Sequence, residues 1–111
     1  MLNIQRRQEE STSIITVKGK VNFEVTSSLR EEVKEVLSTH QPKLLVINLE
    51  GVSLIDSSGL GMLVAVKNSV DKAGSRLHLC CIPPQVAKVF DQTNLTNHFS
   101  IFAAEQDAMR G

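Results

Sequence analysis

A run of short polar residues and glycines, Asp56-Ser57-Ser58-Gly59-Leu60-Gly61, is the part of this sequence best suited to chemistry. It follows a strongly apolar stretch, so a buried strand is expected to pass into a helix here. Asp and Ser side chains at such a boundary accept hydrogen bonds from the first helix amides. Glycine lowers helix stability by about 1 kcal/mol relative to alanine, so Gly59 and Gly61 indicate a close approach to the backbone. The segment is therefore either an ordinary helix cap with tight packing or a site of modification.

A phosphate on Ser57 would give the segment a second role. Phosphoserine carries about −1.5 to −2 charges at pH 7 and would lie at the positive end of the helix dipole. We expect the backbone amides of Gly59, Leu60 and Gly61 to be open to it, because the glycines lack side chains. A partner lying over the same loop would be repelled, especially beside Asp56. The segment therefore predicts a switch in which modification ends binding without unfolding the chain.

The same serines do not match a catalytic nucleophile. A nucleophile elbow needs glycine two residues before the serine, and Ile55 and Asp56 occupy those positions for Ser57 and Ser58. The sequence also lacks the lysine-containing pattern of a phosphate-binding loop. Three histidines are scattered along the chain and do not suggest a general base: His40, His78 and His98. We therefore interpret Ser57 as the substrate of another protein and expect no enzymatic activity, no catalytic residue and no metal site in this chain.

The composition limits the class of protein. A chain of 111 residues, with 41% hydrophobic and 22% charged residues, is typical of one globular domain, here residues 1–111. The formal net charge of zero gives no long-range attraction to nucleic acid. No stretch approaches the roughly 18 apolar residues of a membrane span, and the N-terminus lacks the apolar core of a signal peptide. We expect a cytoplasmic protein that binds neither nucleic acid nor membrane, and its size and balanced charge favour a monomer.

The chain alternates between strand and helix patterns around this segment. Strands are expected at residues 2–7, 13–18, 43–49, 76–82 and 99–102, and helices at residues 25–37, 58–73, from Pro84 onward and near Ala103. Gly19-Lys20 is expected to be a turn, Glu50 to Ile55 a loop, and Ser28-x-x-Glu31 a capping box. The adjacent Cys80 and Cys81 do not match a metal-binding spacing and are expected to be reduced thiols in a buried strand.

Strand–helix–strand connections place neighbouring strands parallel in one sheet, whereas the first two strands could be antiparallel. The predicted fold is therefore α/β, a single domain with a mixed sheet of four or five strands and helices packed on it. In the helix after Ser57, we expect Leu60, Leu63 and Val64 in the core. Met62 is the first candidate for an exposed contact with a partner, unless the whole apolar run packs on the sheet.

Three segments are similar to the anti-sigma factor antagonists, which are built on the STAS domain. They are Leu-Val-Ile-Asn-Leu-Glu-Gly-Val-Ser-Leu-Ile-Asp-Ser-Ser-Gly-Leu-Gly at residues 45–61, Lys-Gly-Lys-Val-Asn at residues 18–22, and Pro84-x-Val86-x-x-Val89-Phe90. The resemblance covers nearly the whole chain in the same element order. One position departs from it, because the family commonly has aspartate where this sequence has Asn22. That position is expected near the phosphorylation loop, so recognition by a kinase could be altered or matched to one specific partner.

The resemblance implies a mechanism called partner switching. The unmodified antagonist binds an anti-sigma factor that is also a serine kinase with a histidine-kinase-like ATP fold, and this binding releases a sigma factor. The kinase then phosphorylates the serine after the aspartate, here Ser57, and a metal-dependent serine phosphatase reverses the step. ATP and magnesium belong to the kinase, so no cofactor is implied for this chain. The partner-binding residues carried over by the resemblance are Asn22, Asp56, Ser58, Gly59, Leu60, Gly61 and Met62.

A second hypothesis keeps the fold and changes the role. STAS-like domains also act as subunits of lipid-transport complexes or as scaffolds of stress-sensing assemblies, in which the serine need not be modified. Co-purification with membrane transporter subunits, in place of a soluble kinase, would favour that hypothesis.

Overall fold

A computed structural model describes residues 2–111, and within them the chain forms one mixed sheet with the strand order β1-β2-β3-β4-β5. Strand β1 is antiparallel to β2, and the remaining neighbours are parallel. The α/β prediction with four or five strands is therefore confirmed, with five. The elements are β1 (Asn3–Glu9), β2 (Thr12–Val21), α1 (Thr26–His40), β3 (Leu44–Ile55), α2 (Ser57–Lys72), β4 (Arg76–Cys80), α3 (Pro84–Gln92), β5 (Ser100–Phe102) and α4 (Glu105–Arg110), with short 3₁₀ turns η1 (Phe23–Val25) and η2 (Thr96–His98).

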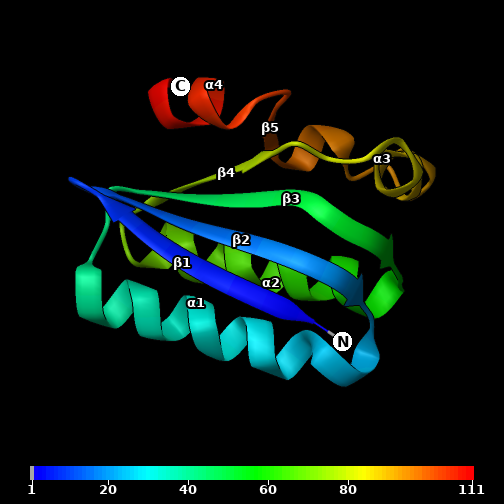
Figure 1. The fold of residues 1–111 in the computed structure, drawn as a ribbon, viewed down its shortest axis with the longest axis horizontal. Coiled ribbons are helices and arrows are strands. Elements are labelled where there is room, and N and C mark those ends of the chain that lie inside the picture. The colour runs from blue at the N-terminus through cyan, green and yellow to red at the C-terminus, as the bar shows by residue number, and fades with distance from the viewer. Residues whose placement is uncertain (1) are drawn as a thin grey trace.

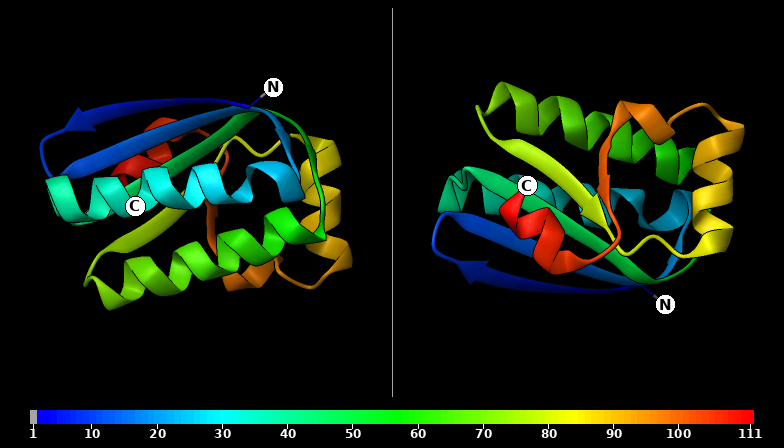
Figure 2. Two further views of the ribbon diagram at one scale, coloured as in Figure 1. Left: turned by 90° about the horizontal axis from the view of Figure 1, so that it is seen from below. Right: turned by 90° about the horizontal axis from the view of Figure 1, so that it is seen from above.

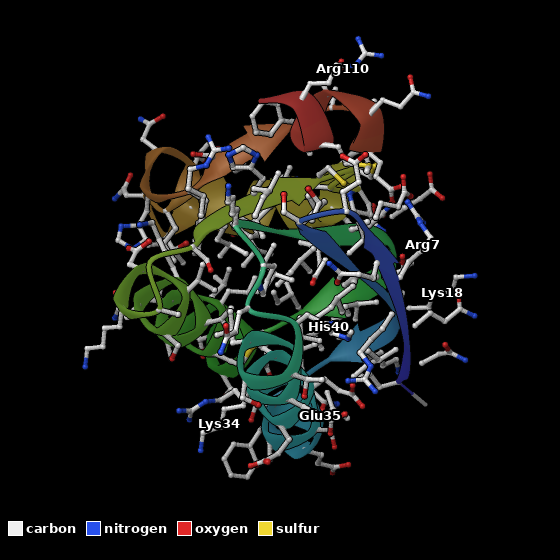
Figure 3. The ribbon with its side chains drawn as sticks, turned by 90° about the vertical axis from the view of Figure 1, so that its left-hand side faces the viewer. Arg7, Lys18, Lys34, Glu35, His40 and Arg110 are labelled. Carbon is white, nitrogen blue, oxygen red and sulfur yellow. The ribbon has the colours of Figure 1, made fainter. Side chains whose placement is uncertain are left out.

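The helices cover the two faces of the sheet unequally. Helices α1 and α2 lie side by side across one face, and the short α4 lies on the other (Figures 1 and 2). Figure 3 shows the same layers from one end, with Arg110 of α4 on one side and Lys34 and Glu35 of α1 on the other. The larger core lies beneath α1, α2 and α3, and a smaller cluster that includes Ile14 and Ala108 lies beneath α4.

The apolar patterns account for most elements. Leu44 to Ile47 are all buried in β3, as expected for a central strand covered on both faces. Helix α1 buries its stripe of Leu29, Val33 and Val36. Helix α2 ends before Gly74, whose φ of 78° is a left-handed conformation that glycine adopts easily. Both cysteines are free thiols, and Cys80 is buried in β4 as expected. The prediction is wrong for Cys81, which lies just beyond the strand and is half-buried.

Three further local predictions are wrong, and two of them concern strand length. Gly19-Lys20 is part of β2 and not a turn, and residues 50–55 continue β3 and do not form a loop. The two strands stay paired as far as Val21 and Ile55 because register shifts absorb the irregular spacing of their polar residues. The proposed capping box is also wrong, because α1 begins at Thr26 and Ser28 already lies inside the helix.

Helix α4 is held on the sheet by polar contacts, of which the one made by His78 is buried. Glu105 accepts a hydrogen bond of 2.9 Å from Nδ2 of Asn48 in β3 and forms an ion pair with Arg7 of β1. His78 Nδ1 lies 2.7 Å from the carbonyl oxygen of Ala108; since a carbonyl can only accept, the ring carries its proton on Nδ1. The hydrogen bonds from Asn48 and then Arg7 lower the pKa of Glu105.

The lowered pKa of Glu105 makes the stability of the chain depend on pH. A carboxylate whose pKa falls on folding stabilises the fold above its unfolded pKa, about 4.3, and loses that contribution as pH falls through the folded pKa. We expect Glu105→Gln to lower the free energy of unfolding by about 0.5–1.5 kcal/mol at pH 7 and by much less at pH 3. Urea unfolding at both pH values tests this. Exposed Glu31→Gln on α1 is the control, and an equal loss at both pH values for Glu105→Gln would contradict the assignment.

Candidate functional site

The site forms at the carboxyl ends of β2 and β3. These strands end side by side, with Val21 opposite Ile55, and the backbone N–H of Asp56 still donates to the carbonyl oxygen of Val21 over 3.3 Å. Helices α1 and α2 both begin at this end of the sheet (Figure 1). The residues after β2 and the first turn of α2 are therefore brought together although they are more than thirty residues apart in sequence.

The carboxylate of Asp56 joins these two segments. Its Oδ1 accepts a hydrogen bond of 2.8 Å from the N–H of Gly59, which caps the start of α2. Its Oδ2 accepts a hydrogen bond of 3.3 Å from the N–H of Phe23, in the turn that follows β2. One side chain thus fixes the position of the helix relative to that turn.

Ser57 is exposed at the first position of α2, and Ser58 beside it is half-buried. The prediction that the amides of Gly59, Leu60 and Gly61 are open is wrong, because α2 begins at Ser57 and the N–H of Gly61 is already paired within the helix. The N–H of Gly59 donates to the side chain of Asp56, and that of Leu60 donates to its carbonyl oxygen over 3.0 Å. Helix geometry instead leaves the N–H groups of Ser57 and Ser58 without intrahelical acceptors.

The two glycines differ in what surrounds them. A methyl group on Gly59 would lie 2.7 Å from the carbonyl oxygen of Val21 and 2.7 Å from a side-chain carbon of Ile55. A methyl group on the exposed Gly61 would meet nothing within 4 Å. The close approach expected from the sequence is therefore made by the chain's own strands at Gly59, whereas Gly61 leaves a bare stretch of helix surface near Ser57.

Asn22 lies next to this segment, as expected, but its side chain serves its own turn. Its Oδ1 accepts a hydrogen bond of 3.1 Å from the N–H of Glu24 and so caps η1. Asparagine and aspartate cap equally well, so the turn does not need a charge at this position. The difference between Asn22 and the aspartate common in antagonists is therefore one of charge near Ser57.

The expectation that Met62 is an exposed contact is wrong. Its side chain is only 4% exposed, because Gly59, Met62, Val66 and Val70 follow one another at helical spacing on the face of α2 that packs on the sheet. Leu60 is buried in the core, as expected. Gly59, Leu60 and Met62 therefore support the site from beneath, and Asn22, Asp56, Ser57, Ser58 and Gly61 reach the surface to different degrees.

Two residues near the site were not predicted from the sequence. Phe23 is 76% exposed and Leu54 is 50% exposed, although both are large and apolar. Phe23 follows Asn22 directly, and Leu54 lies two residues before Asp56. The sequence held one signal for Phe23, since it falls outside the apolar stripe of α1.

Groups that would favour catalysis are not gathered around Ser57. His78 is buried against α4, while His40 and His98 are exposed at the end of α1 and in η2. Within residues 2–111, no three His, Cys, Asp or Glu side chains are arranged to hold a metal ion. In the same part of the chain, no helix combines the length and apolar character needed to cross a membrane.

The different surroundings of the two glycines give a matched pair of variants. We expect Gly59→Ala to lower the free energy of unfolding by about 1–3 kcal/mol, because the added methyl group meets backbone that must shift. We expect Gly61→Ala to raise it by up to about 1 kcal/mol, because alanine favours the helix and the space is open. Chemical denaturation of both variants measures the effect, and equal changes in the two would refute this account of the packing.

Comparison with known proteins gives the family. The model of the STAS domain matches residues 3–108. An anti-sigma F factor antagonist of Paenibacillus polymyxa is 22% identical over 97% of this chain and 92% of its own length, and an anti-sigma-B factor antagonist of Bacillus subtilis is 28% identical over 98% of each. Such antagonists are regulatory proteins and not enzymes.

Solved structures show the same fold. An anti-sigma factor antagonist from Mycobacterium paratuberculosis has a TM-score of 0.88 at 21% identity, covering 99% of this chain and 92% of that one. The phosphorylated form of the Bacillus cell fate determinant SpoIIAA has a TM-score of 0.72 at 21% identity, covering 97% of both chains. The order of strands and helices, the capped start of α2 and the matched residues lead to one conclusion: this chain belongs to the STAS domain family.

Proposed function

We propose that this chain is an anti-sigma factor antagonist whose binding to an anti-sigma factor with serine kinase activity ends when Ser57 is phosphorylated. The observation that carries the proposal is the exposed Ser57 at the first position of α2, directly after the capping Asp56. The names of its curated relatives, which are antagonists of anti-sigma factors along nearly their whole length, support the same role.

The chemistry needs only an accessible hydroxyl on this chain. Oγ of Ser57 forms a bond to the γ-phosphorus of ATP, the bond from that phosphorus to the bridging oxygen breaks, and ADP leaves. The hydroxyl proton passes to a base of the kinase. ATP and magnesium are bound by the kinase, and this chain contributes the position of Ser57, which the cap by Asp56 and the packing of Gly59 hold in place.

The fold can carry the phosphate without rearrangement. Ser57 is exposed, so the added group stays in water, at the positive end of the α2 dipole. The N–H groups of Ser57 and Ser58 have no intrahelical acceptor and can donate to it. A proposal that requires the modified chain to remain folded is supported by the phosphorylated form of SpoIIAA, which has the same fold.

A partner that covers Ser57 would remove the phosphate from water. It would have to take a group with about −1.5 to −2 charges out of water, next to the carboxylate of Asp56. Removing an uncompensated charge from water costs several kcal/mol, and each 1.4 kcal/mol weakens binding about tenfold. Phosphorylation therefore favours dissociation, and a metal-dependent serine phosphatase would restore binding. In this role the chain acts in the bacterial cytoplasm, where it frees a sigma factor from its inhibitor.

Variants of Ser57 separate the hydroxyl from the charge. We expect Ser57→Ala to bind the anti-sigma kinase with unchanged affinity and to stay bound in the presence of ATP and magnesium. We expect Ser57→Asp to bind at least about tenfold more weakly, because one negative charge carries about half of the phosphate's effect. Isothermal titration calorimetry with each purified histidine-kinase-like serine kinase of the source genome measures both affinities, and Ser58→Ala is the matched control.

The intact mass after incubation with the same kinases, ATP and magnesium tests the modification itself. A single added phosphoryl group that maps to Ser57 and is missing from Ser57→Ala supports the proposal. An unchanged mass with every kinase, or equal affinities for Ser57→Ala and Ser57→Asp, would refute it and favour an unmodified scaffold or transport subunit with the same fold.

A further inference from the structure

The two large apolar side chains exposed in the described part of the chain both adjoin the switch segment. Phe23 is 76% exposed and Leu54 is 50% exposed. The backbone of Phe23 is bonded to Asp56, the residue before Ser57, and Leu54 precedes Asp56 by two residues. Single exposed apolar residues are common on protein surfaces. Here two such residues adjoin one modifiable serine.

Phe23 is presented by an ordered turn. The N–H of Phe23 donates to Asp56 Oδ2 over 3.3 Å, and its carbonyl oxygen accepts from Thr26 Oγ1 over 3.1 Å. On either side of it, the N–H groups of Glu24 and Val25 donate to Oδ1 and to the carbonyl oxygen of Asn22, each over 3.1 Å. The backbone that carries the ring is therefore tied on both sides, and little backbone freedom remains to be lost on binding.

The ring makes little contribution to the chain's own core. The stripe that attaches α1 to the sheet consists of Leu29, Val33 and Val36, and the partly buried residues around the core do not include Phe23. Burying a Phe side chain stabilises a complex considerably, and aromatic residues are typical anchors at the centres of interfaces. The position and exposure of Phe23 are those of such an anchor.

We propose that Phe23 and Leu54 are the apolar anchors by which this chain docks on the serine kinase that modifies Ser57. The inference rests on the proposed function and names the contacts that function requires. A kinase must bring the γ-phosphate of ATP to Oγ of Ser57, so its surface covers the residues held around Ser57. Because Phe23 is bonded to Asp56, the surface that reaches Ser57 also meets Phe23.

The charges nearby indicate the chemistry of the partner. Glu24, next to Phe23, is exposed, and Asp56 is half-buried next to Ser57. Exposed Lys20 lies opposite Leu54 in the β2–β3 pairing, so the negative charge is on the Phe23 side of this surface. A complementary surface is an apolar socket with basic groups at the part of its rim that meets Glu24 and Asp56, close to the phosphates of bound ATP. The same contact makes release efficient: an apolar socket excludes water, and a phosphate on Ser57 would then be dehydrated at its edge.

The test uses Phe23→Ala and Leu54→Ala with the purified kinase that phosphorylates the wild-type chain. We expect Phe23→Ala to weaken binding in the presence of ADP and magnesium at least about tenfold, and Leu54→Ala to weaken it less, in proportion to its smaller side chain. Phe23→Leu should retain most of the affinity. The KM for phosphorylation of Ser57 should rise with the dissociation constant while the rate at saturation stays near that of the wild type.

The controls separate docking from folding and from the switch. Phe23 is largely exposed, so the thermal midpoint of Phe23→Ala should match that of the wild type; Lys88→Ala, an exposed change on α3, should alter neither binding nor KM. Wild-type chain that is not phosphorylated by any kinase would overturn the proposed function. Wild-type chain that is phosphorylated, with Phe23→Ala equal to it in affinity and KM, would overturn the anchor alone. A wild-type dimer that Phe23→Ala converts to a monomer, seen by sedimentation, would assign the surface to a second copy.

Discussion

The carboxylate of Asp56 is the contact on which the arrangement of this end of the molecule depends. Its two oxygens bond the amide of Gly59 in α2 and the amide of Phe23 after β2. One side chain can join these segments because β2 and β3 stay paired as far as Val21 and Ile55. The length of the two strands, which the register shifts allow, therefore brings the turn and the helix within reach of a single carboxylate.

The same packing explains why the first turn of α2 presents few large side chains to the solvent. Gly59 must lack a side chain so that α2 can pack against Val21, and Met62 and Val66 continue the same buried face. Outside, Ser57 and Gly61 offer a hydroxyl and bare backbone, and within the described residues no three His, Cys, Asp or Glu side chains are grouped to hold a metal ion beside them. Such a surface fits the proposed switch, in which this chain supplies the position of the hydroxyl and the partner supplies the reactivity.

The sequence was a good guide where one physical pattern dominates. The run from Leu44 to Ile47 predicted a central strand, and the spacing of Leu29, Val33 and Val36 predicted the buried face of α1. It was a poor guide where tertiary contacts decide. The second half of β3 alternates irregularly because of the register shifts, so residues 50–55 resembled a loop.

The same limit applies to the site. Apolar residues occur at so many positions between Leu60 and Val66 that their spacing could not show that Met62 faces inward. The bond from the N–H of Phe23 to Asp56 joins segments distant in sequence, and no local pattern predicts it. The occupied amide of Gly59 is a local helix cap, and its acceptor, Asp56, was among the capping residues that the sequence offered. The positions of Asn22, Asp56 and Ser57 could be predicted because these residues belong to the sequence motifs at residues 18–22 and 45–61.

In the proposed switch, Asn22 sharpens the contrast between the unmodified and the phosphorylated state. The structure uses this side chain as a cap for Glu24, a task that aspartate would perform equally well, so folding does not explain the choice. An aspartate would add a negative charge close to Asp56 before any modification took place. With asparagine, the carboxylate of Asp56 is the charge adjoining Ser57 in sequence, and it is compensated by two N–H donors and the start of a helix. The charge that a phosphate adds to Ser57 is therefore a larger fraction of the local total, and a partner that accepts the unmodified surface has more to lose on its modification.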